Sequence, residues 1–145
     1  MLSESPILAS GNEMYAWATD LFPINRSLTG EGTLKTLNYL KHLLPKLEIK
    51  SIPSGKQVFD WAVPDSWNLT QGYIKDLDGN LLIDFQNNNL HVMGYSTPVS
   101  GIFSKEELSK QVHVLREQPN AIPYVTPYYV YNWGFCMSLN QWENL

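Results

Sequence analysis

The chain has 145 residues, of which 43% are hydrophobic and 17% are charged, so it has ample apolar surface for a folded core. A formal net charge of −4, with no Lys/Arg-rich run, argues against a nucleic-acid partner. The sequence has no stretch of about 18 apolar residues and no basic start, so we expect neither a membrane partner nor a signal peptide. The single cysteine, Cys136, excludes an internal disulfide. Together these features predict a soluble, cytoplasmic protein.

The N-terminal part of the sequence predicts an arm followed by two helices. Residues 1–11 are small and polar, which is typical of a flexible arm. From Glu13 to Leu21 the apolar residues recur at helical spacing, and Pro23 ends that helix. A leucine stripe over 34–44 predicts a second helix, which the following proline ends.

A change of composition near 53–56 predicts a domain boundary. Residues 47–52 alternate in polarity and predict a strand, and 53–55 predict a turn. Beyond it, leucine-rich helix gives way to short runs that are dense in aromatic residues. Ser104 and Glu107 form a capping box, which predicts a short helix over 104–112. No closing helix is expected at the C-terminal end. Strands are predicted at 57–63, at 72–85 as a hairpin turning at Asp78-Gly79, at 90–96, and once or twice within 118–142.

No metal or nucleophile motif is present. His42, His91 and His113 are far apart in sequence, and HExxH and CxxC are absent, whereas a zinc site needs three or four ligands held together. His91 is expected in a half-buried strand with its ring hydrogen-bonded. Cys136 lies among aromatic residues, where burial raises a thiol pKa, so we expect it to be inert. We therefore assign no catalytic residue, metal ligand or cofactor to this chain.

The loop FPINRSLTGEG, residues 22–32, contains Arg26, the cationic residue that most suggests an anion-binding site. Arg26, beside the hydroxyls of Ser27 and Thr29, can hold a carboxylate or phosphate in a bidentate manner. The structural alternative is an arginine that ties the loop to a helix C-terminus. Ser27 or Thr29 is also expected to cap the helix that follows.

The aromatic residues after position 56 have two interpretations. Exposed Trp and Tyr side chains would form a surface for a carbohydrate or a protein partner. Buried ones would build a small β core. Alternation along the predicted strands favours burial for about half of them, so both interpretations stay open.

Six phrases of this sequence are long and unusual in composition: FPINRSLTGEG (22–32), VFDWAVPDSWN (58–68), YIKDLDG (73–79), NLHVMGYSTPV (89–99), QPNAIPY (118–124) and NWGFCMSLNQ (132–141). They resemble the N-terminal part of an aminopeptidase-like family. That family is similar to zinc exopeptidases of the leucyl-aminopeptidase type, and many of its members are encoded in bacterial surface-polysaccharide gene clusters.

The resemblance implies an α+β chain of two parts. Residues 12–55 would be the helices and first strand that begin an α/β exopeptidase domain, and 56–145 would be a mostly β inserted domain that is incomplete here. The family's His and acidic zinc ligands follow the insert, and nothing in this chain matches them. Zinc is therefore expected for the intact member, with no cofactor held by this chain.

We accordingly expect an inactive N-terminal fragment of a zinc-dependent aminopeptidase or amide hydrolase. The residues expected on the substrate side are Arg26, Ser27 and Thr29, which would orient a substrate carboxylate or a neighbouring loop. Trp61, His91 and Trp133 are expected as walls contributed by the insert.

Two alternatives belong to other classes of function. The aromatic part could be a binding module for a glycan or a protein, so the ligands considered are a peptide, an amide or a glycan. The uncharged stretch 118–142 could instead form a subunit interface and make the protein a homo-oligomer.

Overall fold

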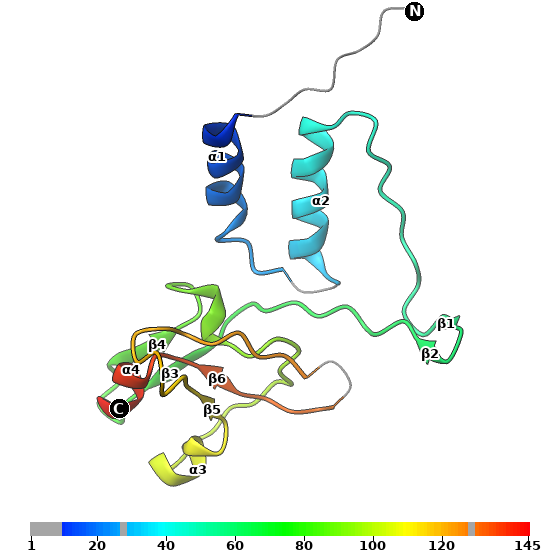
Figure 1. Ribbon diagram of the computed structural model, residues 1–145. Coiled ribbons are helices and arrows are strands. Elements are labelled where there is room, and N and C mark those ends of the chain that lie inside the picture. The colour runs from blue at the N-terminus through cyan, green and yellow to red at the C-terminus, as the bar shows by residue number, and fades with distance from the viewer. Residues whose placement is uncertain (1–9, 27–28, 128–129) are drawn as a thin grey trace, which may run out of the picture.

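The computed structural model describes residues 10–26, 29–127 and 130–145. Two helices come first, and a region of short strands, short helices and extended segments follows (Figure 1). This arrangement confirms the predicted α+β class. None of the helices in the described ranges is long and apolar enough to cross a membrane.

Helices α1 (Gly11–Leu21) and α2 (Glu31–Leu43) confirm both predicted helices. Ser10 and Glu13 form a capping box at the start of α1, so that helix begins before the predicted residue. The two helices run side by side in Figure 1, and the Tyr39 hydroxyl of α2 donates to the Asp20 carboxylate at 2.7 Å. Neither helix contains a buried residue.

The strand predicted over 47–52 is wrong. No strand is assigned to residues 46–53 within the described chain. A strand needs a neighbour for its backbone hydrogen bonds, and the described residues supply none to this segment. The turn predicted at 53–55 is confirmed, with Gly55 at a φ of 76°.

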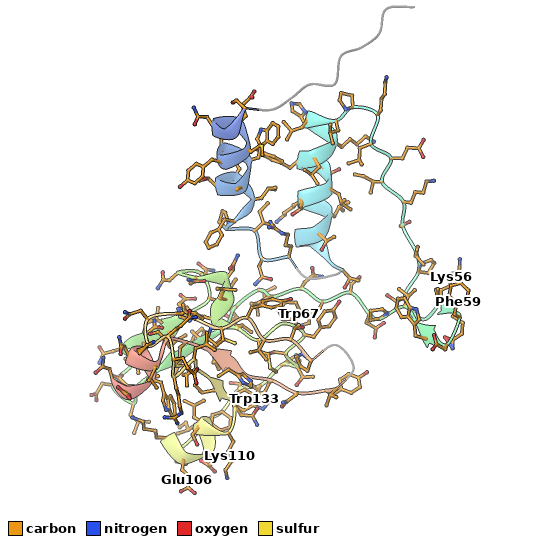
Figure 2. The ribbon with its side chains drawn as sticks, viewed as in Figure 1. Lys56, Phe59, Trp67, Glu106, Lys110 and Trp133 are labelled. Atoms are coloured by element: carbon orange, nitrogen blue, oxygen red, sulfur yellow. The ribbon has the colours of Figure 1, made fainter. Side chains whose placement is uncertain are left out.

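The single strand predicted over 57–63 is a tight hairpin instead. Strands β1 (Gln57–Val58) and β2 (Trp61–Ala62) pair antiparallel on either side of a turn at Phe59 and Asp60. Phe59 has a φ of 55° and is fully exposed at the hairpin tip (Figure 2). Alternating polarity could not reveal this turn, because Phe is an uncommon residue at positive φ.

The hairpin predicted over 72–85 is confirmed. Strands β3 (Tyr73–Lys75) and β4 (Leu81–Asp84) pair antiparallel. Gly79 takes a φ of 89° in the connecting turn. The Asp76 carboxylate accepts hydrogen bonds from the side-chain and backbone nitrogens of Asn80, and these bonds lower the pKa of Asp76.

The strand predicted over 90–96 is wrong, and the 3-10 helix η1 (Asn89–His91) begins there instead. The Asn88 side chain accepts a hydrogen bond from the Leu90 amide and so favours a helical turn at this point. After η1, Val92 forms an isolated bridge to Phe135.

Strand β5 (Val112–His113) pairs in parallel with β6 (Phe135–Cys136). Residues on and around these elements form the buried apolar core. Its most buried apolar members, each no more than 3% exposed, are Ile83, Met93, Cys136 and Met137.

Two five-residue helices complete the region, and each begins with a capping box. Helix α3 (Lys105–Ser109) confirms the first part of the helix predicted over 104–112, and it ends early because β5 follows. Helix α4 (Leu139–Glu143) corrects the expectation of no closing helix. Its signal, Ser138 followed three residues later by Gln141, was present in the sequence. Within 118–142, β6 is the strand that the described residues contain, and 128–129 lie outside them.

Candidate functional site

The first candidate site is the loop between α1 and α2, which we call the junction loop (described residues 22–26 and 29–31). Arg26 Nη1 donates to the carbonyl oxygen of Leu21, the last residue of α1, at 2.6 Å. A cation at a helix C-terminus satisfies a free carbonyl and interacts favourably with the helix dipole. This contact is the one that the structural alternative for Arg26 predicts. A carboxylate-binding role for the exposed Arg26 side chain stays a prediction.

Thr29 connects the junction loop to the C-terminal region and does not cap α2. Its hydroxyl donates to the Asp65 carbonyl oxygen at 3.2 Å and lies 3.0 Å from the Tyr95 hydroxyl. The N-cap residue of α2 is Gly30, which has no capping side chain. The predicted Ser27 lies outside the described residues.

The cap of α2 comes from a distant part of the chain. Asn68 Oδ1 accepts a hydrogen bond of 2.7 Å from the amide of Glu31, the first residue of α2. A side-chain oxygen at this place satisfies one of the free amides of the first helical turn. Asn68 therefore performs for α2 the role that a residue of the preceding loop usually performs.

Glycine is required at two positions of this contact. Gly30 has a φ of 97°, and a Cβ atom there would lie 2.3 Å from the Trp67 carbonyl oxygen. A Cβ atom on Gly32 would lie 1.8 Å from the Asn25 carbonyl oxygen. The glycines of the RSLTGEG phrase thus allow the backbone of the junction loop to approach both the C-terminal region and itself.

Trp67 and Tyr95 form the other side of the contact, and sequence reasoning did not select them. Their rings stack with centroids 5.8 Å apart, and Trp67 Nε1 donates to the Ser96 carbonyl oxygen at 2.9 Å. Figure 2 shows Trp67 below the first turn of α2. Tyr95 has a φ of 59°, an uncommon conformation for a bulky residue. The available signal was that both residues lie in phrases shared with the resembled family.

A pocket of about 220 Å³, which we call the junction pocket, lies beneath the junction loop. Its walls include Phe22 and Ile24 from the loop, and Trp67 and Val92 from the C-terminal region. Arg26 is the charged residue among those that line it. The pocket therefore combines apolar walls with one cation, in a volume suited to a small ligand.

The three predicted wall residues lie in different places. Trp61 is on β2, is 43% exposed, and lines neither the junction pocket nor the groove described below. His91 is only 4% exposed, and its Nδ1 donates to the Cys136 carbonyl oxygen at 2.9 Å. The burial of His91 does not favour a wall role, although its ring is hydrogen-bonded as expected.

The predicted Trp133 borders a second, larger space, which we call the aromatic groove. Trp133 packs against Phe103 and Phe135, with ring centroids 5.2 and 6.5 Å away. The groove has a volume of about 970 Å³ and runs between the segments 66–77 and 96–103. The structure thus places Arg26 among the residues that line the pocket and directs Thr29 to Asp65 and Tyr95, while Trp133 lines the aromatic groove.

The described residues offer no fit to a zinc ion. Among them, no three His, Cys, Asp or Glu side chains come close enough to hold a metal. Cys136 is 1% exposed, and burial raises its thiol pKa from 9.0 to about 11. It is therefore a neutral thiol near pH 7, as expected for an inert buried cysteine.

The fold is a mixed α+β region joined to a pair of helices through the junction loop, with a pocket at the junction and a groove in the C-terminal region. The chain belongs to the family described as Domain of unknown function (DUF2172), which matches residues 66–145. This match begins beside Trp67 and Asn68 and covers the whole aromatic groove.

Two similarities to longer proteins confirm the aminopeptidase-like resemblance. A Clostridium acetobutylicum protein, provisionally named as a polysaccharide biosynthesis protein with an aminopeptidase-like domain, is 43% identical over 136 residues. That alignment covers 94% of this chain and 31% of the relative. A crystal structure from the same organism, provisionally named a peptidase, matches with a TM-score of 0.89 at 43% identity. It covers 93% of this chain and 32% of that one. The chain thus spans about a third of the length of the relatives that it matches.

Proposed function

We propose that this chain forms part of an aminopeptidase-like hydrolase and that it supports the catalytic site without providing the metal ligands. The observation that carries the proposal is the 43% identity over nearly the whole chain to a relative about three times longer. The name of that relative includes an aminopeptidase-like domain. A cytoplasmic location belongs to the same proposal.

The exposed faces of the helices support this assignment. Helices α1 and α2 contain no buried residue, although Met14 and Leu34 are apolar side chains on them. Short helices gain most of their stability in proteins from packing of an apolar face. We propose that residues 12–55 belong with the aminopeptidase-like part of the intact protein, whose other residues cover these faces.

The zinc expected for the intact protein would have to be held elsewhere. Because the described residues do not fit a metal ion, no catalytic step is assigned to them. The contribution proposed for this chain is structural: the junction loop fixes the helices relative to the C-terminal region through Thr29, Gly30 and Asn68.

The test compares this chain with the full-length Clostridium relative. Zinc content after dialysis and hydrolysis of aminoacyl p-nitroanilides would be measured for both proteins. We expect zinc and hydrolysis in the relative and neither in this chain. Stoichiometric zinc in this chain, or a relative that hydrolyses no aminoacyl amide, would contradict the proposal.

A further inference from the structure

The walls of the aromatic groove are two segments of the chain that contain no helix. Every residue of 66–77 and every residue of 96–103 lines it. If the groove lay on the face of a sheet, alternate residues would line it, because successive side chains point to opposite faces. An unbroken run of lining residues on both sides means that backbone as well as side chains borders the groove.

One of these edges has unused backbone donors. The segment 99–103 lies outside the assigned helices and strands. Within the described residues, its amides donate no hydrogen bond to backbone or side chain. Extended backbone with free amides is what an added strand pairs with.

The opposite wall offers the free edge of β3. Phe85 donates from its amide to the Gly72 carbonyl oxygen, in the same register that pairs Tyr73 with Asp84. Hydrogen-bonded and non-hydrogen-bonded pairs alternate in an antiparallel ladder, so the amide and carbonyl of Tyr73 point away from β4. In the described chain β4 is the only strand paired with β3, which leaves that edge open.

The groove has one closed end and cationic residues along its walls. The hydrogen bond from Trp67 Nε1 to the Ser96 carbonyl oxygen links the two walls where they begin. Farther along, Lys75 Nζ lies 5.0 Å from the Tyr73 ring centroid, and Lys105 Nζ lies 5.4 Å from that of Trp142. The Asp76 carboxylate is held by Asn80 in its own turn. The lining therefore carries two ammonium groups and one carboxylate, an excess of positive charge in a chain whose net charge is −4.

Apolar side chains at the rim complete the pattern. Leu77 is 88% exposed and Ile102 is 87% exposed, and both line the groove beside the aromatic rings. Aliphatic side chains next to rows of free backbone groups favour a peptide over a sugar, whose hydroxyls need polar side-chain partners. We propose that the aromatic groove binds an extended apolar peptide segment with a carboxylate near one end. The segment pairs with the backbone of 99–103 or with the free edge of β3.

This inference goes beyond the proposed function, because it concerns peptide binding by this chain and not hydrolysis. The probes are acetylated peptides of about seven residues that alternate valine and threonine and end in two glutamates. Amide hydrogen exchange of the 145-residue chain would be followed by NMR with and without these peptides. We expect new protection at 99–103 or at Tyr73, whereas pairing cannot protect the amides of 47–52, which lie outside the groove.

A matched peptide isolates the backbone contribution. The same peptide with N-methyl groups on alternate residues keeps its side chains but loses the amide donors along one of its two edges. Losing two backbone hydrogen bonds, each worth about 1 kcal/mol, lowers affinity about 30-fold. Equal affinity of both methylation registers and the parent peptide would overturn strand pairing.

Two pairs of variants locate the site on this chain. Ile102→Ser should weaken binding about tenfold, and Ile52→Ser, an exposed change outside the groove, should have no effect. Lys105→Glu should weaken binding of the glutamate peptides about threefold or more, and Lys50→Glu should not. Equal effects within either pair would argue against the groove.

Two further results would overturn the proposal that the groove binds a peptide. If none of these peptides at about 1 mM changes exchange or amide shifts along 66–77 and 96–103, the proposal fails. It also fails if neutral oligosaccharides shift those amides and the peptides do not. Neither outcome depends on whether the Clostridium relative hydrolyses an amide, so failure here is distinguishable from failure of the proposed function.

Discussion

The helical region, residues 10–56, and the C-terminal region, 66–145, place similar side chains in opposite surroundings. Met14 of α1 is 54% exposed, whereas Met93 and Met137 are 2% and 0% exposed. Leu34 on the apolar stripe of α2 is also half exposed. The C-terminal region therefore contains its own core, whereas neither α1 nor α2 contains a buried residue.

This difference in burial indicates which region is stabilised by a core of its own and which is not. Burial of apolar area is the main favourable term in folding, and the helical region has little of it within the described chain. The contacts that hold it are a few hydrogen bonds and two close glycine approaches at the junction loop. We expect the C-terminal region to unfold cooperatively, and the helices to open at lower free energy.

The largest effect is expected from Met137→Ala. Removing a fully buried side chain leaves a cavity, so the free energy of unfolding should fall by about 2–5 kcal/mol. Met14→Ala, the matched change on exposed α1, should alter it by less than about 0.5 kcal/mol. Urea unfolding followed by tryptophan fluorescence measures both. Similar losses for the two variants would mean that the regions share one core.

The Cys136 thiol should react slowly in the folded chain. A pKa raised to about 11 leaves about 100-fold less thiolate near neutral pH than the ordinary value of 9.0. Because the raised pKa favours the neutral form, its contribution to stability is present below pH 9 and is lost as the pH rises from 9 towards 11. The rate of modification by a thiol reagent, with and without urea, measures the first effect. Fast modification of the folded chain would contradict the burial.

Gly30→Ala should release the junction loop. The new Cβ atom meets the Trp67 carbonyl oxygen and the backbone must keep a φ of 97°, so we expect a cost of about 2 kcal/mol or more in the opening of α2. Gly79→Ala is the control, because Gly79 has a φ of 89° with nothing within 4 Å. That change should cost only about 1 kcal/mol, the part due to backbone strain. Amide exchange of α2 measures the opening, and it should rise only in the Gly30 variant.

Asn68→Ala should produce a smaller effect at the same place. Losing the acceptor for the Glu31 amide should destabilise α2 by about 1 kcal/mol, the usual value of an N-cap. Asn38→Ala, an exposed change on α2 itself, should be neutral or slightly stabilising because alanine is the better helix former. If α2 opens equally in both variants, the distant cap contributes nothing.

Much of the local structure follows from residues that are close in sequence. The spacing of apolar residues predicted α1 and α2, and the Ser104–Glu107 box predicted the start of α3. Asp78-Gly79 predicted the turn between β3 and β4. These predictions succeeded because capping, turn formation and helix periodicity depend on contacts within a few residues.

The failed predictions share a different cause. Residues 47–52 alternate like a strand, but strand formation needs a partner that the described chain does not supply. Residues 90–96 also resemble a strand, yet the Asn88 side chain begins a 3-10 helix at that point. The alternation of polarity gave no information about which distant segment would pair with either stretch of residues.

The candidate sites divide in the same way. The sequence alone identified the junction loop as unusual, because it combines Arg26, hydroxyls and glycines, and it associated the chain with an aminopeptidase-like family. Only the tertiary structure decided that Asn68 caps α2, that Gly30 lies against Trp67, and that two segments distant in sequence border one groove. Those outcomes depend on contacts between residues tens of positions apart, which no local propensity encodes.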